Sequence, residues 1–265
     1  MHQQQRNDQP IGLATKCISP QTCDEDMPRL ITQVATDIGP VPDREALPVI
    51  HAALQHQELL PEQHIVDAGY VDAELLVASQ TEYQVDLVGP TGKDHRWQTR
   101  EQTGYALRDF SLDWEREQAC CPQGHISSSW TPAKARDQEV IKIKFAYTTC
   151  GPCPVRSQCT QSRRRTLSVR RREAYEALEA ARQREQTEEF TQVYDQRAGI
   201  EGTHAQGVRR MGLRRSRYIG EPRTHLQHVA TAAAINLCRL DDWLTGVSPH
   251  PTPLSQFERF MKEAA

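Results

Sequence analysis

Five of the chain's eight cysteines lie close together, between Cys120 and Cys159. Eight cysteines in 265 residues are too few for a fold held together by disulfides. Clustered cysteines are more typical of a metal site in a reducing compartment, and the opening MHQQQRNDQP lacks the basic and then apolar pattern of a signal peptide. No apolar run is long enough to span a membrane. We therefore expect a cytoplasmic protein that makes no membrane contact and has a local metal site.

The spacing of these cysteines indicates zinc. Cys150-Gly-Pro-Cys153 offers two thiolates to one tetrahedral Zn²⁺; Cys121 and Cys159 could supply the other two ligands, with His125 in reserve. A Cys-Gly-Pro-Cys run also occurs in thiol oxidoreductases, where it opens a helix after a strand. Turn-forming residues surround it here, which favours structural zinc. The remaining cysteines, Cys17, Cys23 and Cys238, have no evident partner, and we expect Cys238 to be packed within the last helix.

Hydrophobic periodicity predicts an α/β fold in the first part of the chain. Strand patterns cover residues 29–37, 63–69 and 85–89, and helical patterns follow residue 43 and residue 72. Strands and helices that alternate in this way predict a mixed sheet flanked by helices. We assign residues 1–13 to a disordered start and 14–89 to the first part of this core.

The later sequence predicts an insertion and then helices. Residues 90–170 hold short strand-like runs (106–114 and 140–146), loops and the cysteines, so we expect a cysteine-rich insertion of strands and loops. Residues 171–245 predict helices over 171–186, 187–208 and 222–243, followed by a tail over 246–265. Thr187 is a predicted N-cap, with Glu188 and Glu189 in the first turn. The last helix carries an apolar stripe of Leu226, Val229, Ala233, Leu237 and Leu240.

Charge is informative only locally. The 32 Lys and Arg against 35 Asp and Glu exclude a uniformly basic surface for nucleic acid. Five arginines nevertheless occur within residues 208–218, without an acidic residue among them. They are Arg209, Arg210, Arg214, Arg215 and Arg217. Guanidinium groups bind phosphate with two parallel hydrogen bonds, so the cluster predicts contact with nucleic acid, although a solvated turn would look similar.

Two acidic positions stand out as candidates for chemistry. Asp67 follows a buried strand pattern, where open α/β sheets place reactive groups, although such an aspartate often only holds a turn or caps a helix. Asp72 could cap the next helix instead. Tyr194, Arg197 and Glu201 are spaced to share one helical face, which is also common on solvated helices.

At these residues the sequence resembles the DDE-type transposases of bacterial insertion sequences, in the branch with a cysteine-bearing insertion. The matching stretches are TCDEDMPRLITQV, LLPEQHIVDAGYVDAELLV, YQVDLVGP, CPQGH, CGPCPVRSQCT, YDQRAGIEGTHAQGVRRMGLRRSRYIG and THLQHVATAAAINLCRL. The resemblance implies an RNase H-like core in which three carboxylates hold Mg²⁺ or Mn²⁺. It also implies DNA strand cleavage and strand transfer at insertion-sequence ends, a homo-oligomer bound to the terminal repeats, and association with the nucleoid.

Carried onto this sequence, the resemblance makes Asp67 the second acid and Glu201 the third. Tyr194 and Arg197 match the family's Y-x2-R-x3-E signature, while the basic residue expected seven positions after the glutamate falls on Val208, with Arg209 one position later. The first acid has no counterpart, because Asp24 and Asp26 lie in the wrong place for it. We therefore expect an N-terminally truncated transposase with impaired activity.

Two other functions fit parts of the pattern. The first is a zinc-stabilised DNA-binding remnant without catalysis, in which the arginines grip phosphates and Asp67 and Glu201 are structural. The second is a thiol oxidoreductase built around Cys150 and Cys153. Each predicts a different arrangement of the same residues.

Overall fold

The computed structural model describes residues 15–24, 27–39, 41–92, 96–101, 104–135 and 138–247. The predicted disordered start, Asp26, and most of the predicted tail lie outside these residues. The fold is mixed α/β, as predicted, but its strands form small sheets of two or three strands. The chain makes two compact units. Unit 1 comprises the described residues up to Ile65 and from Thr191 on, and unit 2 is Val66–Phe190.

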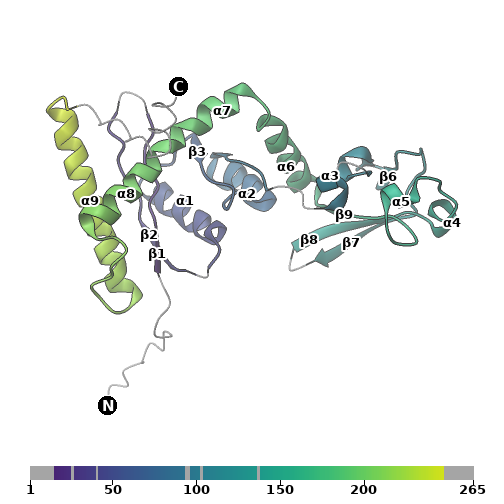
Figure 1. Cartoon of the computed structure of the whole chain (residues 1–265), viewed down its shortest axis with the longest axis horizontal. Helices are drawn as coiled ribbons and strands as arrows, with labels where there is room; N and C mark the ends of the chain where they lie inside the picture. Colours follow the sequence, from purple (N-terminus) through teal and green to yellow (C-terminus); the bar gives the residue numbers. More distant parts are fainter. Residues whose placement is uncertain are drawn as a thin grey trace, which may run out of the picture. The chain divides into compact units, whose positions relative to one another are not determined.

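Unit 1 places a strand pair between helices. Strand β1 (Thr15–Ile18) pairs antiparallel with β2 (Ala35–Ile38). The turn η1 (Asp43–Glu45) leads into α1 (Ala46–His56), and β3 (Gln63–Ile65) follows. Helix α8 (Gly199–Met211) packs on α9 (Glu221–Leu244), and the strand pair lies between α9 and α1 (Figure 1). Two small apolar clusters fill the unit: Ile31, Val34, Ala232 and Ile235 in one, and Ala46, Ile50 and Leu54 in the other.

The strand predicted over residues 29–37 begins only at Ala35. Upstream of it, the backbone of Ile31 bonds to the side chain of Asn236 on α9. The Ile31 N–H donates to Asn236 Oδ1 (2.8 Å), and Asn236 Nδ2 donates to the Ile31 carbonyl (2.9 Å). The Thr32 N–H donates to the Pro20 carbonyl. These backbone groups are therefore satisfied by a side chain and a nearby loop instead of a neighbouring strand.

The apolar stripe predicted for the last helix lies on the exposed side of α9. Leu226 and Leu237 are 66% and 67% exposed, Val229 and Ala233 are also exposed, and Leu240 is half-buried. The buried side instead carries Thr224, His228, Thr231, Ala232 and Ile235. Its polar members have hydrogen-bond partners, such as Thr36 Oγ1 at 2.7 Å from His228 Nδ1, which makes their burial tolerable. The prediction that Cys238 is packed is also wrong, because it is exposed.

In unit 2, α2 (Ala73–Tyr83) packs against α6 (Arg172–Arg184). Asp72 caps α2, as predicted, by accepting the Glu74 N–H at 3.1 Å. In strand β4 (Asp86–Val88), the Val88 carbonyl accepts the Val66 N–H. Arg184, near the end of α6, donates to both carboxylate oxygens of Asp86 at 2.7 and 2.8 Å. This pair ties α6 to β4.

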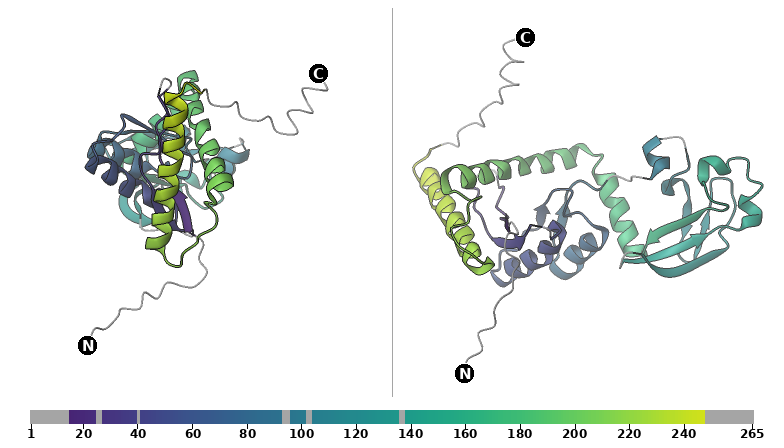
Figure 2. Two further views of the ribbon diagram at one scale, coloured as in Figure 1. Left: turned by 90° about the vertical axis from the view of Figure 1, so that its left-hand side faces the viewer. Right: turned by 60° about the horizontal axis from the view of Figure 1, so that its bottom comes forward.

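The cysteine-rich region of unit 2 is built on an antiparallel sheet of order β7 (Ser129–Ala135), β8 (Gln138–Lys144) and β9 (Thr166–Arg170) (Figure 2). Its core consists of Phe110, Ala119, Ile143, Phe145, Leu167 and Val169. Shorter elements surround it: α3 (Trp97–Glu101), η2 (Leu107–Asp109), β5 (Ser111–Asp113), β6 (Gln118–Cys120), α4 (Tyr147–Cys150) and α5 (Arg156–Cys159). Strands and loops make up most of this stretch, and its helices are short.

The helix predicted over residues 187–208 is interrupted. Helix α7 (Glu188–Asp195) is followed by the 3₁₀ turn η3 (Gln196–Ala198) and only then by α8. Thr187 caps α7, as predicted, because its Oγ1 accepts the Phe190 N–H at 3.1 Å. A 3₁₀ turn has fewer residues per turn than an α-helix, so the ideal helical spacing does not carry through from Tyr194 to Glu201.

Candidate functional site

Asp67 lies in unit 2, in the segment that follows β3. Its side chain is half-buried, and its Oδ1 accepts the Gly69 N–H at 2.8 Å, while its carbonyl accepts the Tyr70 N–H. These bonds fix a tight turn that begins at the carboxylate. The local geometry is therefore that of an aspartate that holds a turn. Asp67 is not needed to cap α2, because Asp72 does so.

The signature residues lie on three consecutive elements: Tyr194 at the end of α7, Arg197 in η3 and Glu201 in the first turn of α8. Glu201 is exposed, whereas Tyr194 and Arg197 are half-buried. Glu201 lies in the first turn of α8, at the positive end of the helix dipole. Its exposed carboxylate is accessible from solvent.

A buried polar network fixes α8 two residues after Glu201. Thr203 is 2% exposed, and its Oγ1 donates to Gln21 Oε1 at 2.6 Å. Arg239 of α9 donates to Thr203 Oγ1 (2.6 Å), to Gln21 Oε1 (3.2 Å) and to the Arg29 carbonyl. Burial, and then the nearby Arg29, lower the pKa of Arg239. The network connects α8, α9 and the loop before β2, and it holds the helix that presents Glu201.

Sequence reasoning missed this network. Its one sequence signal is Arg239, a cation in the largely apolar stretch AAAINLCRL, since a charged group in such a stretch needs buried partners. Arg29 was missed as well. Its guanidinium lies against Gly199, where an added Cβ would meet Arg29 Nη1 at 1.6 Å. Glycine at the first position of α8 therefore leaves room for the Arg29 side chain.

The five predicted arginines lie in unit 1 at the end of α8 and in the loop before α9, and all are exposed. Gly212, with φ of +66°, ends α8 in the left-handed conformation, and the Leu213 N–H donates to the Gly207 carbonyl. Among the residues that the structure describes, none of the five arginines forms an ion pair. Arg170, Arg171 and Arg184 of unit 2, by contrast, all pair with acids. The arginine loop (Gly212–Gly220) therefore offers uncompensated positive charge.

Side chains of α9 hold the arginine loop in place. Gln227 Oε1 accepts the Arg217 N–H (2.9 Å), and its Nε2 donates to the Arg215 carbonyl (2.9 Å). Thr224 Oγ1 lies 3.0 Å from Ser216 Oγ, whose hydroxyl donates to the Tyr218 carbonyl. One carboxamide thus fixes the backbone on both sides of Ser216 and leaves the arginine side chains in solvent.

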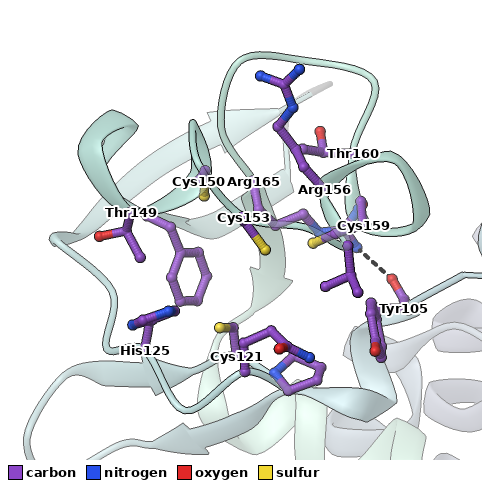
Figure 3. Close-up of a pocket in the computed structure, with 14 residues that line it drawn as sticks. Tyr105, Cys121, His125, Thr149, Cys150, Cys153, Arg156, Cys159, Thr160 and Arg165 are labelled. Atoms are coloured by element: carbon purple, nitrogen blue, oxygen red, sulfur yellow. Dashed lines mark hydrogen bonds between the residues drawn. The ribbon is translucent and has the colours of Figure 1, made fainter.

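The cysteine-rich region brings the four predicted zinc ligands to one small cavity. Cys121, Cys150, Cys153 and Cys159 line it together with His125 and Arg165, and Figure 3 shows the four sulfurs pointing into the same space. Three of the cysteines also pack on the core of the β7–β8–β9 sheet. Cys120 does not line the cavity, because the strand alternation turns it away from Cys121. Within the described residues, no group of three or more His, Cys, Asp or Glu side chains has its atoms already placed to hold a metal ion.

Burial of Cys159 favours the protonated form of this one thiol in the absence of a cation. Burial raises the pKa of Cys159 to about 11; the other three thiols of the cavity raise it too, and Arg165 lowers it. The guanidinium of Arg165 is 8% exposed and donates to the Cys159 carbonyl (2.7 Å) and the Tyr105 carbonyl (3.4 Å). One buried cation therefore lies beside four thiols.

One family model matches part of the chain. Residues 120–241, just under half of the chain, match the family model described as "Transposase DDE domain". The matched range includes the cysteine cavity, Glu201 and all five arginines, and it leaves Asp67 outside. Searches of curated proteins and of solved structures gave no match. No helix among the described residues is long and apolar enough to cross a membrane.

Proposed function

We propose that the chain, whose residues 120–241 match the model of the transposase DDE domain, is a DDE-type transposase that cleaves and transfers DNA strands at insertion-sequence ends with Mg²⁺ or Mn²⁺. In this proposal Asp67 and Glu201 are two of three metal-binding carboxylates on an RNase H-like core, and 90–170 is an insertion in that core. The chain acts as a homo-oligomer on the terminal repeats. One observation supports the proposal most strongly: the matched range holds an exposed glutamate followed by five exposed arginines that form no ion pair with any residue the structure describes.

The residues present suit hard divalent cations. Mg²⁺ prefers oxygen ligands, and Asp67 and Glu201 supply carboxylates. Glu201 makes no ion pair within the described part of the chain. Metal ions held there would lower the pKa of an attacking water or DNA 3′-hydroxyl and stabilise the leaving oxygen at phosphorus. The Thr203–Arg239–Gln21 network contributes by fixing the backbone that carries Glu201, so that this carboxylate needs little reorganisation before it binds.

The arginines contribute affinity for DNA rather than sequence reading. Their guanidinium groups are exposed and form no ion pair within the described segments, and Gln227 holds the backbone of the loop that carries Arg214, Arg215 and Arg217. Each phosphate that such a loop neutralises releases a condensed counterion, so DNA binding should weaken steeply with salt. Tyr194 and Arg197 precede Glu201 in the sequence and are half-buried. In this proposal they contact the same DNA.

Activity of this chain is expected to be weak. Two carboxylates are assigned, and no residue is assigned to the first acid of the triad, so metal ions would have fewer ligands than in the complete site. The second candidate function, a zinc-stabilised DNA-binding remnant without catalysis, is favoured by this same observation. The thiol oxidoreductase has little support, because Cys150 ends the one-turn α4 and Cys153 precedes the one-turn α5, so neither opens a long helix.

The test is a salt series of DNA binding combined with a nicking assay. Fluorescence anisotropy on a labelled insertion-sequence end should show affinity that falls with salt. The triple variant Arg214→Ala, Arg215→Ala and Arg217→Ala should reduce the slope of log affinity against log salt by roughly 0.9 per lost phosphate contact. The control Arg171→Ala removes a paired arginine from unit 2 and should leave the slope unchanged.

Cleavage then separates the two candidates. Slow nicking of the same DNA in Mg²⁺ or Mn²⁺, lost in Glu201→Gln and kept in Glu189→Gln on α7, supports the transposase. DNA binding by wild type without nicking in either metal supports the remnant. A wild-type chain that does not bind DNA contradicts both.

A further inference from the structure

We propose that Cys121, Cys150, Cys153 and Cys159 bind one structural Zn²⁺ at the tip of the cysteine-rich region. The inference stands apart from the proposed function, because it rests only on the cavity in unit 2. Three separate chain segments supply the four thiols: the turn after β6, the end of α4 with the link that follows it, and the end of α5. Four thiols that line one space match the number of ligands in a tetrahedral zinc site.

The backbone around each ligand group is a tight turn. The Gly124 N–H donates to the Cys121 carbonyl (2.8 Å), and the Cys121 N–H donates to the His125 carbonyl (2.9 Å), so residues 121–125 close on themselves. Gly124 has φ of +80°, which suits this turn. On the other side, the Cys153 N–H donates to the Cys150 carbonyl (3.3 Å). One turn thus carries Cys121 and the other carries Cys150 and Cys153, while Cys159 comes from the end of α5.

The cavity has the size of an ion site. Its volume is about 30 Å³, far below the several hundred Å³ that small-molecule sites occupy. The charge also fits. Zinc with four thiolates carries a net charge of about −2, and the buried guanidinium of Arg165 lies beside it and offsets part of that charge. His125 is exposed at the rim, which makes it a poorer ligand than the four thiols.

Zinc binding would complete a region that has little else to hold it. The helices on either side of the cysteines, α4 and α5, are four residues each, and the apolar core beneath them is small. Small domains of this kind commonly depend on a structural metal. The sulfurs must rotate about their Cα–Cβ bonds to reach coordination distance, and each thiol that binds gives up its proton to solvent. Four protons are therefore released per ion, and affinity falls as pH falls.

The first experiment is elemental analysis of the full-length chain purified without added metal. We expect one zinc per chain in wild type. Cys153→Ser and Cys121→Ser should lose it, whereas Cys120→Ser and Cys238→Ser, which change cysteines outside the cavity, should keep it. His125→Ala should also keep it, since the proposed set is four sulfurs.

Spectroscopy on the wild-type chain keeps the test valid if a cysteine variant fails to fold. X-ray absorption at the zinc edge should show four sulfurs at about 2.3 Å and no nitrogen. Replacing zinc with Co²⁺ should give the thiolate charge-transfer band and the strong visible bands of a tetrahedral sulfur site. Wild-type protein without zinc that gives no such cobalt spectrum would overturn the proposal. Full zinc content in Cys153→Ser, or a disulfide between Cys150 and Cys153 in freshly purified protein, would overturn it as well.

Discussion

Two glycines of α8 should respond in opposite directions to the same substitution. Gly212 ends the helix with φ of +66°, where an alanine Cβ is strained, so Gly212→Ala should lower the free energy of unfolding by about 1 kcal/mol. Gly202 lies within the helix, and an added Cβ meets nothing within 4 Å. Gly202→Ala should therefore raise stability by roughly 0.5–1 kcal/mol. Urea unfolding measures both, and equal effects of the two changes would contradict this assignment of the helix end.

A histidine pair, in which His51 is buried and His64 half-buried, should make unit 1 sensitive to acid. His51 Nε2 and His64 Nδ1 are 3.0 Å apart, so one ring donates and the other accepts, which requires at least one neutral ring. Burial, and then His51, lower the pKa of His64 to about 4. Between pH 6.5 and 4 the unfolded chain binds more protons than the folded chain. The contribution of His64 to the free energy of unfolding is therefore fully present above pH 6.5 and is lost as the pH falls toward 4. At pH 5 the loss is at most about 2 kcal/mol.

The check is urea unfolding of wild type and two variants from pH 7 to pH 5. His64→Gln should flatten the pH dependence, whereas His56→Gln, which changes an exposed histidine at the end of the same helix α1, should leave it as in wild type. A His64→Gln variant with the full wild-type slope would show that other groups cause the acid sensitivity. His204 and His228, whose pKa values burial also lowers, are the next candidates.

Residues with local roles were predictable from sequence, and those with distant partners were not. Asp72 and Thr187 were identified as caps because a cap depends on the next few residues alone. Cys121, Cys150, Cys153 and Cys159 were grouped by spacing, and they share a cavity. Thr203 and Gln21 escaped notice, because the hydrogen bond between them joins positions far apart in the chain, which no local pattern encodes.

At the scale of elements, the arginine loop depends on one side chain of α9. Gln227→Ala removes both hydrogen bonds to the loop backbone, so amide exchange at Arg217 should speed up by tenfold or more, and DNA affinity should fall several-fold because a mobile loop must be ordered on binding. Hydrogen exchange and anisotropy measure the two effects. Gln192→Ala, an exposed glutamine on α7, is the control. Unchanged exchange at Arg217 would contradict the role given to Gln227.

The errors at this scale have a common cause. Sequence patterns predict which helices exist but not which side is covered, and α9 buries threonines and a histidine because their partners, such as Thr36, come from another element. The strand expected from Arg29 begins only at Ala35 for a similar reason: the side chain of Asn236, from another element, bonds to the backbone of Ile31. No helix-breaking residue precedes the 3₁₀ turn η3, so the sequence did not predict the interruption there.

At the scale of the whole molecule, the order of elements along the chain was largely predictable, because strand and helix periods differ. The grouping into two units was not predictable, because unit 1 combines the first and last parts of the described chain, and unit 2 is the segment between them in sequence. Asp67 and Glu201 belong to different units. Their shared role is the central part of the proposed function, and it comes from the family resemblance.

Metal binding tests that role most directly, and it does not require the chain to be fully active. Electron paramagnetic resonance of Mn²⁺ titrated into the full-length chain with DNA should show a bound ion that Mg²⁺ displaces. Asp67→Asn and Glu201→Gln should each weaken Mn²⁺ binding by tenfold or more, whereas Glu62→Gln and Glu189→Gln, which change exposed acids nearby in sequence, should bind like wild type. Wild-type Mn²⁺ affinity in either Asp67→Asn or Glu201→Gln would contradict the assignment of these two carboxylates to the metal site.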